Sequence, residues 1–421
     1  MQTSKPTSSA VRLLNLAFVG DERGDIYAIN INDGSLFWSN NLGNYVRADC
    51  FDLPGGMYGI GGTPTFNRTI DTLYVVGGDG KFYALSMKTG AVIWSLLIYD
   101  NTLLHSRGGL SLRNEVAYSI FSSHCDFGNY NGKITAVSVT SRKILHEFFP
   151  TVNTATTFGA GIWGSGGVSW GDGSLSSSGY SAIGNCKNPN PQNTSYCLKA
   201  VRLDPSLKVV ATISNHAKAT VPDCDFGATV TFFNSETDRT SGCQKSLAVV
   251  LRKDGYVFVM DAATMVVIQT LILMKSTSDG QFISSPAWDP DSNMLVIADP
   301  ADTDLTGDPS TTFVHGAVGL KLLSTCKLQK RWNAQLDVTA PRGNYAYSSP
   351  TIVGPVGNRV VFLTTGKFNN VYAISLYTGQ VLWKGALDDA AFAAPTIING
   401  VVLVSGRGST PDGQALYAFG L

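Results

Sequence analysis

Three nearly superimposable stretches decide the fold of this sequence. They read YAININDGSLFW at residues 27–38, YALSMKTGAVIW at residues 83–94 and YAISLYTGQVLW at residues 372–383. Each stretch predicts a strand of alternating side chains, a tight turn that contains glycine, and a second strand that ends in tryptophan. Because the pattern recurs far apart along the chain, we expect a repeat protein built from β-hairpins.

Weaker copies of the hairpin fill the interval between the second and third stretches, and a partial copy, ALYAFGL, closes the chain. Short segments rich in glycine, serine, alanine and proline precede most copies. We expect these segments to be innermost strands, because small side chains suit the place where the blades of a ring converge. The expected inner segments contain Gly62, Gly109, Gly166, Gly227, Ser284, Ser348 and Ala393.

One repeat unit therefore has four strands, and units follow one another every ~45 to 65 residues, as in a propeller blade. The sequence predicts an all-β chain whose residues 1–421 form a single β-propeller domain of about eight four-stranded blades. We expect the incomplete copies at the two ends to join in one closing blade, which removes an exposed edge and leaves seven blades as the alternative count. The tryptophans at equivalent repeat positions are expected to pack in the core: Trp38, Trp94, Trp332 and Trp383.

Composition and charge exclude several classes of function. Lys and Arg together number 31, as do Asp and Glu, so the net charge is zero and we expect no nucleic-acid partner. No apolar run is long enough to span a bilayer. The five histidines are isolated in the sequence, which argues against a zinc site. No phosphate-binding or dinucleotide-binding glycine motif is present.

The seven cysteines favour an oxidising compartment. Cys186 and Cys197 flank a polar loop and are predicted to form a disulfide, and the spacing of Cys224 and Cys243 also suits a local disulfide, with one cysteine left unpaired. The alternative is a set of free thiols packed as small apolar groups.

The compartment predicted from the cysteines is extracellular or periplasmic, although the N-terminal residues do not have the shape of a signal peptide. Two glycosylation sequons lie in predicted turns and agree with a secreted protein. They begin at Asn67 and Asn193.

The repeat resembles the tryptophan-docking repeat of dehydrogenases that depend on pyrroloquinoline quinone (PQQ), a pattern also carried by non-catalytic propellers of outer-membrane assembly factors. Four further segments resemble, in order, those of the small, soluble polyvinyl-alcohol-dehydrogenase-like propellers. They are HCDFGN at 124–129, GAGIWG at 159–164, SAIGN at 181–185 and DCDFG at 223–227. The chain is thus similar to quinoprotein dehydrogenase-like propellers over its whole length.

The resemblance implies chemistry on a cofactor that lies across the propeller axis, with a Ca²⁺ that polarises the reactive carbonyl of PQQ. It implies that Asn185 is an amide ligand of the metal and the cofactor, and that Asp225 is a metal ligand and the catalytic base. Trp163 lies in the inner strand that precedes Asn185 and is the second candidate for cofactor binding. Asp223, two residues before Asp225, is an additional carboxylate that could share these roles.

Two features depart from the family pattern. The family's third acidic ligand is a glutamate, whereas the matching stretch SIFSSHC, residues 119–125, has no carboxylate before Asp126. Asp126 is the candidate replacement. The family's adjacent-cysteine disulfide is absent, because Cys125 is preceded by His124. With this incomplete ligand set, we expect weak metal binding or none.

The predicted site residues also have a purely structural interpretation, since Asn185 can cap a turn and the two aspartates can form turn hydrogen bonds at the start of a strand. Two functions therefore remain open. The first is a PQQ- and Ca²⁺-dependent oxidoreductase for an alcohol or a sugar, which passes electrons to a separate acceptor because no haem-attachment motif is present. The second is a secreted or assembly-forming propeller without a cofactor, which binds a protein partner or serves as a scaffold. The incomplete ligand set favours the second function for present activity.

Overall fold

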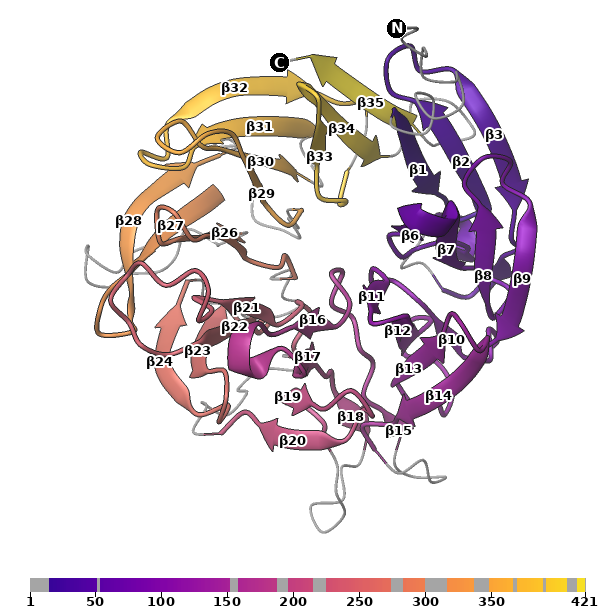
Figure 1. The fold of residues 1–421 in the computed structure, drawn as a ribbon, viewed down its shortest axis with the longest axis horizontal. Coiled ribbons are helices and arrows are strands. Elements are labelled where there is room, and N and C mark those ends of the chain that lie inside the picture. The colour runs from indigo at the N-terminus through magenta and orange to yellow at the C-terminus, as the bar shows by residue number, and fades with distance from the viewer. Residues whose placement is uncertain are drawn as a thin grey trace, which may run out of the picture.

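A computed structural model describes residues 15–50, 54–151, 158–187, 196–214, 225–273, 283–299, 316–336, 348–365, 369–388, 391–406 and 415–420. Within these ranges, eight antiparallel sheets of three to five strands follow one another around a ring (Figure 1). Each sheet is one blade, numbered here in chain order. The prediction of an all-β propeller with eight blades is confirmed.

The first four blades are formed by residues 16–212. Blade 1 contains β1 (Leu16–Gly20), β2 (Asp25–Asn30) and β3 (Leu36–Asn41). Blade 2 contains β6 (Thr65–Asn67), β7 (Thr72–Val76), β8 (Lys81–Ser86) and β9 (Val92–Leu97). Blade 3 contains β11 (Ser111–Arg113), β12 (Val116–Ser123), β13 (Lys133–Ser138) and β14 (Lys143–Phe148), with β10 (Leu104–His105) paired to the end of β12. Blade 4 contains β16 (Ser169–Trp170), β17 (Gly179–Ala182), β19 (Ala200–Leu203) and β20 (Val209–Thr212).

The last four blades repeat this order. Blade 5 contains β21 (Thr231–Phe233), β22 (Leu247–Leu251), β23 (Tyr256–Asp261) and β24 (Val267–Ile272). Blade 6 contains β25 (Ala287–Asp289), β26 (Met294–Asp299), β27 (Gly316–Leu322) and β28 (Leu328–Gln335). Blade 7 contains β29 (Thr351–Val353), β30 (Val360–Thr365), β31 (Asn370–Ser375) and β32 (Val381–Ala386). Blade 8 contains β33 (Thr396–Ile398), β34 (Val401–Gly406) and β35 (Ala415–Gly420).

Two pairs of short strands lie outside the blades. β4 (Tyr45–Val46) and β5 (Met57–Tyr58) form a hairpin in the chain between blades 1 and 2. β15 (Phe158–Gly159) pairs with β18 (Cys186–Lys187) where blade 3 meets blade 4 (Figure 1). The only helices in the described ranges are single 3₁₀ turns at Pro54–Gly56, Arg68–Ile70 and Gly173–Leu175. None of the helices in the part of the chain that the structure describes is long and apolar enough to cross a membrane.

The inner strands form a belt around the centre of the ring (Figure 1). The first residue of several inner strands donates its hydroxyl hydrogen to a carbonyl of the next blade. Thr231 donates to the Pro286 carbonyl at 3.1 Å and Thr351 donates to the Pro395 carbonyl at 2.7 Å. The small residues predicted for these segments are needed because neighbouring backbones approach closely. A side chain at Gly62 would lie 2.4 Å from the carbonyl oxygen of Gly108.

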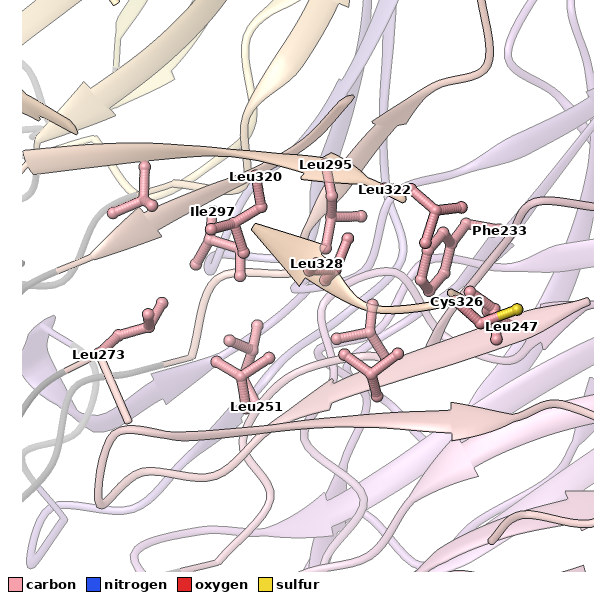
Figure 2. Packing of buried hydrophobic residues seen from close by; sticks show 14 of the residues in the cluster. Phe233, Leu247, Leu251, Leu273, Leu295, Ile297, Leu320, Leu322, Cys326 and Leu328 are labelled. Atoms are coloured by element: carbon pink, nitrogen blue, oxygen red, sulfur yellow. The ribbon is translucent and has the colours of Figure 1, made fainter. Parts of the chain in front are cut away.

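The hydrophobic core lies between successive blades, because the apolar side chains of each sheet pack against those of the next sheet. Figure 2 shows the cluster between blades 5 and 6, in which Leu247 and Leu251 meet Leu295, Ile297 and Leu320. Burying one such side chain contributes roughly 1.5–3 kcal/mol. Six similar clusters join the other neighbouring pairs from blade 1 to blade 8 among the described residues.

The repeated tryptophan joins one blade to the glycine turn of the next. The indole of Trp38 donates to the Met87 carbonyl at 2.9 Å, and the indole of Trp332 donates to the Leu376 carbonyl at 2.7 Å. Both side chains are buried, as predicted.

The prediction is wrong for Trp383, whose 37 % exposure has a simple cause. Blade 8 lacks a fourth strand in the described residues, so Trp383 contacts the Phe419 ring instead of a glycine turn. Trp94 is partly buried and stacks on Phe82.

The two ends of the described chain form neighbouring three-stranded sheets, whereas we expected them to join in one blade. A complete blade has four strands, numbered from the inside outward. Blade 1 has the second to fourth of these strands, and blade 8 has the first to third. Each end therefore supplies a complete meander of three paired strands, which forms its own sheet.

Three disulfides are present in the described residues. The predicted bond between Cys186 and Cys197 is confirmed. Cys243 bonds to Cys326 of blade 6, which corrects the expected local pairing of Cys243; Cys224 lies outside the described residues. Cys50 bonds to Cys125. Spacing rules favour near neighbours in the sequence, but the ring brings residues 75 and 83 positions apart into contact.

The tryptophan contact predicts unequal effects for three glycines at the same turn position. Gly34, Gly90 and Gly379 all have φ near +70°, but a methyl group at Gly34 would meet nothing within 4 Å. At Gly90 it would lie 2.5 Å from the Trp38 ring, and at Gly379 2.7 Å from the Trp332 ring. Gly34→Ala should therefore lower the free energy of unfolding by about 1 kcal/mol, the conformational cost alone. Gly90→Ala and Gly379→Ala should each cost about 2–4 kcal/mol, because overpacking is added. Urea unfolding measures the difference, and equal losses at the three sites would refute the docking contact.

Candidate functional site

A cavity of about 290 Å³ lies where loops of blades 3, 4 and 5 meet. Its volume is close to the lower end of the roughly 300–1,000 Å³ that is usual for ligand pockets. The three oxygen ligands predicted from the sequence, Asp126, Asn185 and Asp225, all line this cavity. The remaining lining residues are Tyr130, Phe158, Gly159 and Cys186.

Asp126 lies in the loop between β12 and β13. Its carboxylate accepts hydrogen bonds from the Ser123 hydroxyl at 3.2 Å and from the Tyr130 hydroxyl at 2.5 Å. Burial raises the pKa of Tyr130, and the charges of Asp126 and Asp225 raise it further. The phenol therefore stays protonated and donates to Asp126. Asp126, Tyr130 and Asp225 all line the same cavity.

Asp225 precedes the inner strand of blade 5 and is almost fully buried. Its Oδ1 forms an ion pair with Lys253 Nζ at 2.8 Å, and its backbone carbonyl accepts the Lys253 amide hydrogen at 3.0 Å. Lys253 lies in the turn between β22 and β23, so one residue of the turn fixes both ends of the aspartate. Sequence reasoning missed this lysine, because a lysine in a β-turn is ordinary.

Asn185 lies in the turn between β17 and β18, where its carbonyl accepts the Ala160 amide hydrogen at 2.5 Å. The adjacent Gly184 explains why this turn reaches the cavity. A Cβ atom at Gly184 would lie 2.7 Å from Asp225 Oδ2 and 3.2 Å from Trp163 Nε1. The second oxygen of Asp225 is thus turned toward the Gly184–Asn185 turn, and Trp163 lies beside the cavity rather than on its wall. Asp223 lies outside the described residues.

Two histidines that are isolated in the sequence lie side by side in the structure, because β10 pairs with the end of β12. The rings of His105 and His124 are 5.2 Å apart, and both lie against Tyr58. Burial lowers the pKa of both histidines, most strongly for His105, and the charges of Arg107 and His124 lower the pKa of His105 further. The His105 ring also contacts Trp163, which connects this pair to the candidate site.

The residues present fit a hard cation and a polar ligand. Two carboxylates and an amide are the oxygen donors that Ca²⁺ prefers. Within the described ranges, no three His, Cys, Asp or Glu side chains form a metal site, so Asn185 is needed to complete a set of three. Ser122, beside Gly161 and Trp163, is fully buried, and its hydroxyl has no partner among the described residues. A buried hydroxyl without a partner indicates a place for water or a ligand.

Comparison with known sequences shows the family. A profile of the family described as outer membrane protein assembly factor BamB matches residues 5–149 and 327–419, more than half of the chain. The chain belongs to this family of PQQ-like β-propellers. No curated protein matches the sequence significantly.

Solved structures of PQQ-like propellers share the fold. A europium-containing methanol dehydrogenase superposes with a TM-score of 0.66 at 13% identity, covering 95% of this chain and 81% of the dehydrogenase. The quinohemoprotein alcohol dehydrogenase from Comamonas testosteroni gives 0.63 at 14% identity, covering 97% and 73%. BamB from Moraxella catarrhalis gives 0.58 at 13% identity and covers 97% of both chains. At these identities the likeness concerns the fold alone.

The buried histidines predict a stability that depends on pH. Below about pH 6.5 the unfolded chain binds protons at His105 and His124 that the folded chain does not bind. The free energy of unfolding should therefore fall as the pH falls below about 6.5, by up to 1.4 kcal/mol per pH unit for each histidine. His105→Gln should make this slope shallower, because it removes one of the two buried imidazoles. Urea unfolding between pH 5 and pH 8, a range of about 3 pH units around the usual histidine pKa, measures the slope. An unchanged slope in His105→Gln would contradict the neutral buried imidazole.

Proposed function

We propose that this chain is a PQQ- and Ca²⁺-dependent oxidoreductase that acts on an alcohol or a sugar. The observation that carries the proposal is the convergence of Asp126, Asn185 and Asp225, which come from three different blades, on one cavity. The sequence argument against this function was the missing glutamate. The position of Asp126 removes that argument, because a third oxygen donor now lines the same cavity.

The cation would be held by the carboxylate of Asp126, the amide oxygen of Asn185 and Oδ2 of Asp225, with Trp163 beside the cofactor. When bound, PQQ supplies the electron acceptor for the substrate carbon, and Ca²⁺ polarises the carbonyl of the quinone. Tyr130 and Ser123 hold the Asp126 carboxylate in place through their hydrogen bonds. A fixed ligand binds a cation at a smaller entropic cost than a mobile one.

Asp225 is the proposed base that removes the proton from the substrate hydroxyl. Its ion pair with Lys253 favours the ionised carboxylate, which is the form that accepts a proton. The same pair fixes the orientation of the carboxylate, so Oδ2 stays turned toward Asn185. Phe158 contributes an apolar side chain to the lining of the cavity.

The three disulfides suit an oxidising compartment. We propose an extracellular or periplasmic location, and a separate redox partner that takes up the electrons. A protein that passes electrons to a separate acceptor needs no haem of its own.

A second candidate function has one observation in its favour. The chain and the BamB structure cover each other almost completely, and the matching profile is that of an assembly factor. In this alternative the propeller binds a protein partner, carries no cofactor, and retains the cavity only as a remnant of the fold.

Reconstitution separates the two candidates. The purified chain is incubated with PQQ and Ca²⁺, and reduction of an artificial dye is followed with simple alcohols and sugars. We expect turnover that Asp225→Asn lowers by ~10²–10⁴, because the general base is lost. Asp33→Asn, a change at an exposed carboxylate in blade 1, serves as the control and should keep full activity. If the wild-type chain neither turns over nor retains PQQ during gel filtration, the oxidoreductase proposal is refuted and the assembly-factor alternative is the one left.

A further inference from the structure

The described residues of the β4–β5 hairpin, 45–50 and 54–58, contact the three residues around Asp126, which are His124, Cys125 and Phe127. The rings of Tyr45 and Tyr58 lie 5.2 Å and 3.9 Å from the His124 ring. Cys50 is bonded to Cys125. The Arg47 guanidinium lies 4.7 Å from the centre of the Phe127 ring. Residues 124, 125 and 127 are therefore all held by the same hairpin.

Asp126 differs from its neighbours in this loop, since its side chain lines the cavity, which no described residue of the hairpin lines. The backbone turns at this point, so that the residues around Asp126 meet the hairpin while Asp126 lines the cavity. Cys125 has φ 49° and Asp126 has φ 54°, both in the left-handed region that side chains other than glycine rarely adopt. Two consecutive residues in this region persist only where surrounding contacts hold them. The disulfide and the three ring contacts hold these residues.

The hairpin itself is firmly placed. Cys50 and Tyr58 are buried, and the Cys50 sulfur contacts the Tyr58 hydroxyl. The Arg47 amide donates to the Gly56 carbonyl at 2.8 Å and joins the two arms of the hairpin, and the Cys50 amide donates to the Arg47 carbonyl at 3.1 Å in a local turn before the disulfide. A built side chain at Gly56 would lie 2.0 Å from the Arg47 carbonyl oxygen, so the hairpin is also packed tightly across its base.

We propose that the β4–β5 hairpin is a clamp that positions Asp126 as a cation ligand, with the Cys50–Cys125 disulfide as its principal contact. The inference rests on the proposed cation site for its functional consequence, but the clamp is a property of the chain alone. Cys50, Arg47 and Tyr58 are positioning residues, because they act on the site through Asp126 and do not touch the cavity.

The chain offers a matched control for the disulfide. The Cys243–Cys326 bond also joins segments that are far apart in the sequence, since it spans 83 residues, compared with 75 for Cys50–Cys125. Loss of either bond should therefore destabilise the folded chain to a similar extent on the loop-entropy model. Neither Cys243 nor Cys326 lines the cavity. A difference between the two variants thus reports the clamp and not general stability.

The experiment compares wild type, Cys50→Ser/Cys125→Ser and Cys243→Ser/Cys326→Ser by two measurements. The first is amide hydrogen exchange of residues 123–131 in the metal-free protein. The second is titration with Tb³⁺, an oxygen-seeking cation, followed by its luminescence. We expect faster loop exchange and an affinity lowered by ~10–100-fold only in the first variant, the range seen when supporting contacts of metal ligands are removed. Arg47→Ala, which keeps both disulfides, should change both quantities in the same direction by a smaller factor.

The outcomes separate the clamp from the cation site. If loop exchange and Tb³⁺ affinity in the Cys50 variant equal those in the Cys243 variant, the clamp is refuted, although wild-type Tb³⁺ binding would still support the cation site. If wild type binds no Tb³⁺ but loop exchange rises only in the Cys50 and Arg47 variants, the clamp holds and the proposed function fails. Should the Cys50 variant not fold, unchanged loop exchange in Arg47→Ala refutes the clamp.

Discussion

The structure depends on the packing of each blade between two neighbours. A single three- or four-stranded sheet cannot bury both of its apolar faces, and the ring solves this by placing every interior sheet between two others. The belt of inner hydrogen bonds and the tryptophan–glycine contacts fix the angle between successive blades. The loops between strands can then vary without loss of the core, and the candidate site is built from such loops.

The candidate site illustrates what this arrangement allows. Asp126, Asn185 and Asp225 come from three blades, and no short motif contains all of them. Their side chains converge because the blades fix where each loop emerges. Each carboxylate has a partner that holds it in place, since Lys253 pairs with Asp225 and Tyr130 donates a hydrogen bond to Asp126. Such preorganised donors are what a cation site requires, since they need little rearrangement to bind.

Local patterns in the sequence predicted the blades well, because hairpin alternation, glycine turns and small inner residues act over a few positions. They also predicted the short disulfide between Cys186 and Cys197. The tryptophans were predicted correctly where a glycine turn follows in the next blade, as for Trp38, and wrongly for Trp383, where the described chain offers none. The error shows that a repeat position is buried only if its neighbour in space exists.

Contacts between distant segments could not be predicted from the sequence. The fold brings residues that are far apart in the sequence into contact. The Cys50–Cys125 and Cys243–Cys326 bonds and the pair of buried histidines are such contacts. The role of Asp126 illustrates the same limit. The sequence shows only an aspartate near the place of an expected glutamate, whereas its position in the cavity depends on a left-handed backbone and on the β4–β5 hairpin.

The central claim is that Asp126, Asn185 and Asp225 form one set of cation ligands. Crystals grown with a lanthanide and measured at its absorption edge test this claim directly. The account predicts one strong anomalous peak within about 2.3–2.6 Å of an oxygen of each of the three side chains. A peak bound by other residues, or an empty cavity at a saturating concentration of lanthanide, would contradict it.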